Sequence, residues 1–149
     1  MIEFSEKQRN SENWLAKVIS WFILTIILII AVSFYYDRND VIPKIIVIII
    51  LIFFMVYLNT MNFEYKIDEH FISYKYYPFH KDWNRIERNE VLEITIIKYK
   101  PLKEFGGWGI RSNGRINAYT MWGNSGILIT LKNGSKILFG TQKYTNHNQ

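Results

Sequence analysis

Two apolar runs decide the fold: VISWFILTIILIIAVSFYY at residues 18–36 and IIVIIILIFFMVYL at residues 45–58. The first run holds 19 residues without a charged side chain. At about 1.5 Å per helical residue, a run of this length crosses the roughly 30 Å hydrocarbon core of a bilayer. Because only residues 37–44 separate the two runs, the pattern predicts a two-helix transmembrane hairpin over residues 18–61.

The second run is shorter, so a helix that spans the bilayer here must also include residues on either side of the run. We expect this helix over about residues 43–61, since Pro43 suits the first turn of a helix and the Lys44 side chain can snorkel. A buried segment of a soluble protein is one alternative. A cleaved signal peptide is another, with Ala31-Val32-Ser33 as its cleavage site. The second apolar run and the acidic residues before the first run favour an anchor.

Aromatic and lysine side chains near the ends of the spans are candidate membrane-interface anchors. They are Trp14, Trp21, Tyr35, Tyr36 and Lys44. Basic residues are more numerous on the outer flanks of the hairpin than in its connecting loop. The positive-inside rule therefore predicts a multi-pass protein of the inner (cytoplasmic) membrane with both termini in the cytoplasm. Residues 1–17 are expected to form a polar cytoplasmic tail.

From residue 62 onward the apolar period changes from helical to two, which is typical of antiparallel β-structure. Phe63, Tyr65 and Ile67 alternate with polar residues, and Asn133-Gly134 is a strong hairpin-turn signal. We expect seven or eight short strands without an intervening helix. Residues 62–149 are thus predicted to form an all-β sandwich or small barrel with an aromatic-rich core.

This region contains the short motifs Trp83-x-x-Ile86, Lys98-Tyr99-Lys100-Pro101, Gly106-Gly107-Trp108-Gly109-Ile110-Arg111, Ala118-Tyr119, Gly126-Ile127 and Gly140-Thr141-Gln142-Lys143. Together they resemble the motifs of small bacterial membrane proteins that carry a pleckstrin-homology-like (PH-like) domain. The match covers residues 62–143, and its most specific part is the Gly-Gly-Trp-Gly-Ile-Arg run. The resemblance implies two membrane helices followed by a PH-like barrel of two packed antiparallel sheets. It implies no established chemistry.

The resemblance also implies a C-terminal helix that plugs one mouth of the barrel, and the sequence departs from this. Residues 141–149 are polar and lack helical periodicity, so we expect the capping helix to be missing. The open mouth is then expected to be covered by the membrane surface, by a second copy of the chain or by a partner helix.

Phosphoinositide binding in PH-like domains uses basic residues in the loop that joins the first two strands. Here that loop is Asp68-Glu69-His70. Because an acidic loop repels phosphate, specific phosphoinositide binding is not expected.

Composition excludes several function classes. The chain has no cysteine, which removes disulfides, thiolate catalysis and cysteine-type zinc sites. A net charge of +5 is too mild for a nucleic-acid-binding surface. His70, His80 and His147 are scattered along the chain, without the carboxylate spacing of a metal site or a catalytic triad. We therefore expect no enzyme activity, no cofactor and no metal.

Trp108 and Arg111 are the remaining candidates for a binding site, with Arg111 contacting a carboxylate or phosphate and Trp108 flanking it. A structural role is the alternative, in which the glycines let the backbone pass close to the ring and Arg111 pairs with Glu104.

The function that the sequence favours is a membrane-anchored interaction module that holds a protein or peptide partner at the inner membrane surface. Its partners would be the lipid bilayer and a protein or a second copy of the chain, and not nucleic acid. The alternative is a small subunit of a transport or channel assembly, which the lack of charged residues within both runs disfavours.

Overall fold

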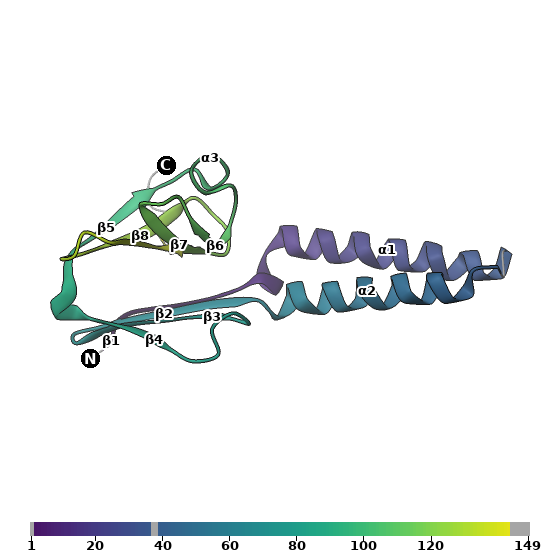
Figure 1. Cartoon of the computed structure of the whole chain (residues 1–149), viewed down its shortest axis with the longest axis horizontal. Coiled ribbons are helices and arrows are strands. Elements are labelled where there is room, and N and C mark those ends of the chain that lie inside the picture. The colour runs from purple at the N-terminus through teal and green to yellow at the C-terminus, as the bar shows by residue number, and fades with distance from the viewer. Residues whose placement is uncertain (1, 37–38, 144–149) are drawn as a thin grey trace. The chain divides into compact units, whose positions relative to one another are not determined.

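The computed structural model describes residues 2–36 and 39–143, without the side chains of residues 2, 3 and 35. The chain divides into two compact units (Figure 1). One is helical and spans Arg9–Met61. The other is a β domain that combines Met1–Gln8 with Asn62–Gln149. The predicted range of the β domain, residues 62–149, is therefore incomplete, because a segment that precedes the hairpin also belongs to this domain.

The helical unit contains a short 3-10 helix, η1 (Asn10–Glu12), and two long α-helices, α1 (Trp14–Tyr36) and α2 (Val41–Thr60). Each α-helix includes a segment long and apolar enough to cross a membrane, of 21 residues in α1 and 20 in α2. Asn13 caps α1 by accepting a hydrogen bond from the Leu15 backbone N–H over 3.0 Å. The helices lie side by side (Figure 1), and Asn59 Nδ2 of α2 donates to Ser20 Oγ of α1.

The first sheet of the β domain has four strands in the order β1-β2-β3-β4. They are β1 (Ile2–Arg9), β2 (Asn62–Asp68), β3 (Phe71–Tyr77) and β4 (Asn84–Glu87). The prediction of a polar tail over residues 1–17 is wrong here, since β1 is part of the sheet. Its buried residues Glu6 and Gln8 are polar, so the strand lacks the alternating apolar signal by which β2 was found.

The second sheet has five strands in the order β5-β8-β9-β7-β6. A 3-10 helix, η2 (Arg88–Glu90), leads into β5, and a one-turn helix, α3 (Pro101–Phe105), follows that strand. The prediction of no intervening helix is wrong at α3. The strands are β5 (Val91–Lys98), β6 (Gly109–Ser112), β7 (Ile116–Thr120), β8 (Ser125–Leu131) and β9 (Lys136–Thr141).

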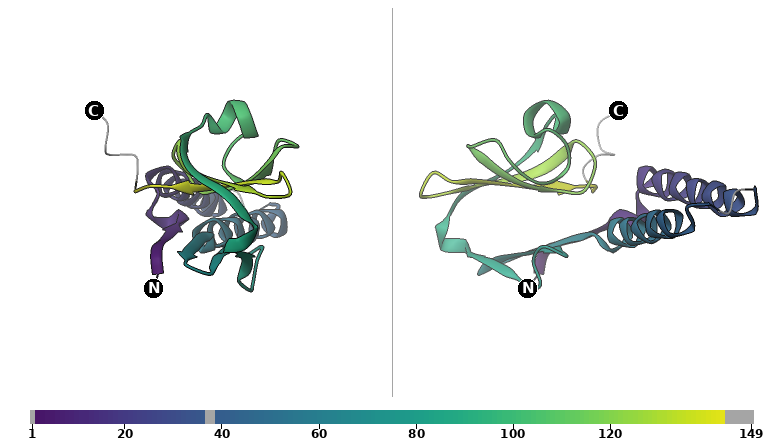
Figure 2. Two further views of the ribbon diagram at one scale, coloured as in Figure 1. Left: turned by 90° about the vertical axis from the view of Figure 1, so that its left-hand side faces the viewer. Right: turned by 45° about the vertical axis from the view of Figure 1, so that its right-hand side comes forward.

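The two sheets pack as an open sandwich (Figure 2) and are not closed into a barrel. Most pairs are antiparallel, but β7 and β9 run parallel, with Ile116 opposite Lys136. The expectation of two fully antiparallel sheets is therefore wrong for this pair. The parallel pairing requires β8 to return the chain to the same end of the sheet, which local sequence patterns do not reveal.

The predicted aromatic core is confirmed between the sheets. Phe63 and Tyr65 of β2 lie against Phe139 of β9, with ring centroids 5.5 and 5.2 Å apart. A second cluster lies on the other face of the second sheet, where Tyr99 and Phe105 cover Ala118 and Leu138. The expectation of a missing capping helix concerns residues 141–149, of which 144–149 lie outside the described residues.

Candidate binding surfaces

Trp108 and Arg111 lie close together where the chain enters β6. Trp108 Nε1 donates a hydrogen bond to the Gly123 carbonyl over 2.8 Å, and Arg111 Nε donates to the Trp108 carbonyl over 3.2 Å. Gly109 between them has a φ of +109°, a conformation that suits glycine. The Trp108 N–H is thus used inside the domain, whereas the Arg111 side chain is exposed.

Glu104 does not provide the partner that the sequence suggested for Arg111. Its Oε1 accepts a hydrogen bond from the Lys100 backbone N–H over 2.8 Å and so holds the start of α3. Gly106 ends this one-turn helix with a φ of +70°.

The histidines are not brought together. His70 lies in the turn between β2 and β3 and His80 lies after β3, while His147 is outside the described residues. Within residues 2–36 and 39–143, no group of three or more His, Cys, Asp or Glu side chains is placed to hold a metal ion.

His80 lies instead beside two tyrosines between the sheets. Its ring centroid is 6.0 Å from that of Tyr74 and 5.8 Å from that of Tyr119. Burial raises the pKa of Tyr74 above its usual range, and the hydrogen bond with Tyr119 raises it further. The Tyr74 phenol therefore keeps its proton to a higher pH than an ordinary tyrosine does.

A buried carboxyl group that the sequence did not single out joins the first and last strands of the β domain. Glu6 Oε2 accepts hydrogen bonds from Tyr65 Oη over 3.0 Å and from Thr141 Oγ1 over 2.6 Å. Glu6 Oε1 accepts from Gln8 Nε2 and from the Gln142 backbone N–H, each over 2.8 Å. With four donors, Glu6 has a structural role.

An apolar overhang on β5, formed by Leu92 and Ile96, is a second feature that the sequence did not predict. The register places Ile96 opposite Ile127, which is opposite Phe139. Ile96 is therefore on the face of the second sheet that packs against the first, yet it is 53% exposed, and Leu92 at the start of the strand is 67% exposed. As an edge strand, β5 has one side without a neighbouring strand in the described sheet.

The predicted interface anchors lie on the two long helices. Trp14, Trp21 and Tyr36 are exposed on α1, and the Tyr35 side chain lies outside the description. Lys44, near the start of α2, holds its ammonium group 5.5 Å from the Phe34 ring centroid at the end of α1. Lys44 and Phe34 thus mark the same end of the hairpin.

Comparison of the sequence with protein-family models and with curated proteins finds no match.

Proposed function

We propose that this protein is a membrane-anchored, non-enzymatic interaction module. Its β domain holds an extended segment of a partner protein along β5, at the cytoplasmic surface of a bacterial inner membrane. The two long apolar helices support the anchor. Apart from Lys17 and Lys44 near their N-terminal ends, α1 and α2 contain no Lys, Arg, Asp or Glu, which disfavours an ion path.

The apolar overhang on β5 carries this proposal. An edge strand offers backbone N–H and C=O groups to an added strand, and such strand addition is a common way of binding peptides. Burial of Leu92 and Ile96 by the added segment would be favourable, at about 25 cal/mol per Å² of apolar surface. The partner segment that fits is extended, with apolar residues at alternate positions.

Kinship with PH-like membrane proteins is part of the proposal. The order of two helices and then two mostly antiparallel sheets is compatible with it. The parallel β7–β9 pair departs from the arrangement that the resemblance implies. The interaction role does not depend on this kinship, because it rests on the edge strand.

Site-specific photo-crosslinking in cells tests the binding role. A photoreactive residue at position 96 should give a reproducible crosslinked partner, and Leu92→Asp should abolish that product. The matched control is a photoreactive residue at position 102, because Leu102 is 71% exposed but lies on α3 and not on β5. Equal products from positions 96 and 102 would contradict the proposal.

The membrane topology has a separate test. Since the chain has no cysteine, single substitutions Asn39→Cys and Ser135→Cys provide unambiguous labelling sites. A membrane-impermeant maleimide applied to the outer side should label position 39 only. Labelling of position 135 in sealed cells would reverse the proposed orientation.

A further inference from the structure

A lysine-rich groove lies on the outer face of the first sheet. In β2, Phe63, Tyr65 and Ile67 are buried, so the intervening residues Glu64 and Lys66 point to the opposite, outer face. Lys75 of β3 is directly opposite Glu64 in the strand register. Side chains from β2 and β3 therefore lie next to each other on this face, and Lys7 of the neighbouring strand β1 joins them.

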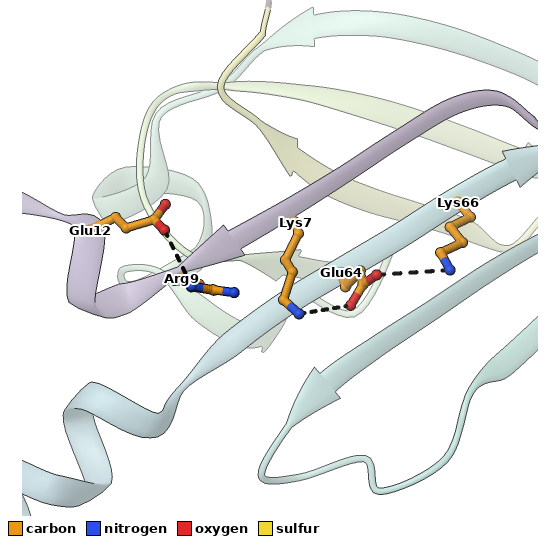
Figure 3. Close-up of polar contacts among 5 residues, drawn as sticks. All are labelled: Lys7, Arg9, Glu12, Glu64 and Lys66. Atoms are coloured by element: carbon orange, nitrogen blue, oxygen red, sulfur yellow. Dashed lines mark ion pairs between the residues drawn. The ribbon is translucent and has the colours of Figure 1, made fainter.

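One carboxylate is shared by several ammonium groups here. Figure 3 shows Glu64 between two lysines, with Lys7 Nζ 3.6 Å from Glu64 Oε2 and Lys66 Nζ 3.9 Å from Glu64 Oε1. Lys75, the cross-strand neighbour of Glu64, adds a third positive charge on this face. The excess of positive charge favours an additional anion.

The groove itself is open to solvent, has a volume of about 330 Å³, and is lined by Lys7, Asn62, Glu64, Lys75, Tyr77 and Trp83. The Lys66 ammonium group lies 4.7 Å from the centroid of the Trp83 ring. This cation–π contact stabilises the Trp83 side chain at the side of the groove. Aromatic side chains of this kind are enriched at membrane–water interfaces, where one end of the ring is in contact with lipid and the other with water.

Chain connectivity keeps one residue of this groove, Asn62, close to the end of α2. Asn62 begins β2 two residues after Thr60 ends α2, and Tyr77 is paired with Asn62. Consecutive Cα atoms are about 3.8 Å apart, so the rim of the groove at Asn62 lies within about 8 Å of the last residue of α2. When the hairpin spans a bilayer, which is the premise taken from the proposed function, this rim is at the headgroup level.

We infer that the groove binds the phosphate group of an anionic phospholipid of the inner leaflet. Lys7 and Lys75 contact the phosphate oxygens, and Trp83 and Tyr77 pack beside the glycerol backbone. Lysine ammonium groups bind phosphate as point charges, without the fixed geometry that arginine imposes. The site therefore selects for negative charge on the lipid and for a phosphate held at the membrane surface.

Native mass spectrometry of the full-length protein, released from nanodiscs, tests the inference. The nanodiscs contain phosphatidylcholine with a minor fraction of phosphatidylglycerol, and the retained lipids are counted. The unmodified protein should retain phosphatidylglycerol in preference to phosphatidylcholine. In the double variant Lys7→Gln/Lys75→Gln, the ratio of retained phosphatidylglycerol to phosphatidylcholine should fall by up to roughly thirtyfold, as expected for two basic residues near an anionic surface.

The matched control is Lys132→Gln/Lys136→Gln, which removes the same charge from the turn after β8 and from the first residue of β9. It should retain phosphatidylglycerol at the level of the unmodified protein. The variant Lys7→Arg/Lys75→Arg keeps the charge and should restore the preference, which separates loss of binding from loss of folding. Equal losses in the groove variant and in the control would overturn the inference.

A second arm distinguishes the lipid from free phosphate. Millimolar inorganic phosphate, added to nanodiscs of the same composition, should not displace the retained phosphatidylglycerol. Displacement would show that the groove binds free phosphate and would overturn the lipid assignment. If maleimide labelling confirms the topology but the groove variant has no effect, this inference fails while the proposed anchor stands. If labelling shows no insertion, both fail.

Discussion

The Glu6 carboxylate accepts a hydrogen bond from the Thr141 hydroxyl over 2.6 Å, although 135 residues separate the two along the chain. Glu6 precedes both long helices and Thr141 ends the last strand. The hairpin is therefore an insertion between neighbouring strands β1 and β2, and the β domain is complete only when both flanking segments are present. The contact also joins the first sheet to the second.

Removal of the Glu6 carboxylate should destabilise the β domain strongly. Glu6→Ala leaves the Tyr65 and Thr141 hydroxyls and the Gln142 N–H without their acceptor in a site where Glu6 is only 7% exposed. We expect the free energy of unfolding to fall by about 3 kcal/mol, because buried donors lose a charged partner. Denaturant unfolding of the full chain in detergent measures this. Ser5→Ala on the exposed face of β1 is the control and should change stability by less than about 0.5 kcal/mol.

A fragment of residues 62–149 should not fold cooperatively, because it lacks β1 and leaves the inner donors around Glu6 unpaired. Replacement of residues 10–61 by a two-residue Asn-Gly turn should restore folding. The Asn10 N–H donates a hydrogen bond to the Met61 carbonyl over 3.0 Å, so the first and last residues of the replaced segment are already neighbours. Circular dichroism and denaturant titration of both proteins provide the comparison. Equal cooperativity would show that β1 is dispensable.

Gly126 and Gly140 face each other in the β8–β9 register, but they differ in the space around them. A Cβ at position 126 would lie 2.7 Å from Leu138 Cδ1 and 2.8 Å from the Phe139 carbonyl, whereas at position 140 the nearest atoms are those of Thr120 at 3.2 Å. Gly126→Ala should therefore cost about 2 kcal/mol of folding free energy through overpacking. Gly140→Ala should cost less. Thermal unfolding of the two variants side by side gives the order.

Tyr99 should make stability decrease at alkaline pH. Burial of its phenol, which is 3% exposed, is the main reason that its pKa is raised to about 12, from about 10 in the unfolded chain. The folded state favours the protonated form, so this stabilisation is complete below pH 10 and is lost as the pH rises through 12. The loss is at most about 3 kcal/mol, of which about 2 kcal/mol is reached by pH 11.5. In Tyr99→Phe, the decrease in unfolding free energy between pH 9 and pH 11.5 should be smaller by that contribution; an unchanged slope would assign the decrease to other groups.

The hairpin could be predicted from the sequence because its signal is local. Nineteen uncharged residues in a row have the length and hydropathy of a span whatever surrounds them. The same holds for the turns at Asp68–His70 and Asn133–Gly134 and for β2, whose residues alternate between buried and partly exposed. These elements are confirmed close to their expected positions.

The surroundings of the candidate site residues could not be predicted from local sequence patterns. Trp108 and Arg111 were identified by residue type, but the hydrogen bond from Trp108 to Gly123 depends on how β6 and the loop before β8 meet. The three lysines around Glu64 come from β1, β2 and β3, so only the strand register brings them together.

The sequence by itself determined that two helices can cross a membrane and that a β domain with an aromatic core accompanies them, since both follow from short-range periodicity. Only the tertiary structure decided that residues 2–8 belong to that domain, that β7 and β9 run parallel, and that Ile96 is left uncovered. The first two are pairings between residues far apart in the chain, and the third follows from the place of β5 at the edge of its sheet. The free energy of such pairings comes from contacts and buried hydrogen bonds that exist only after the chain has folded.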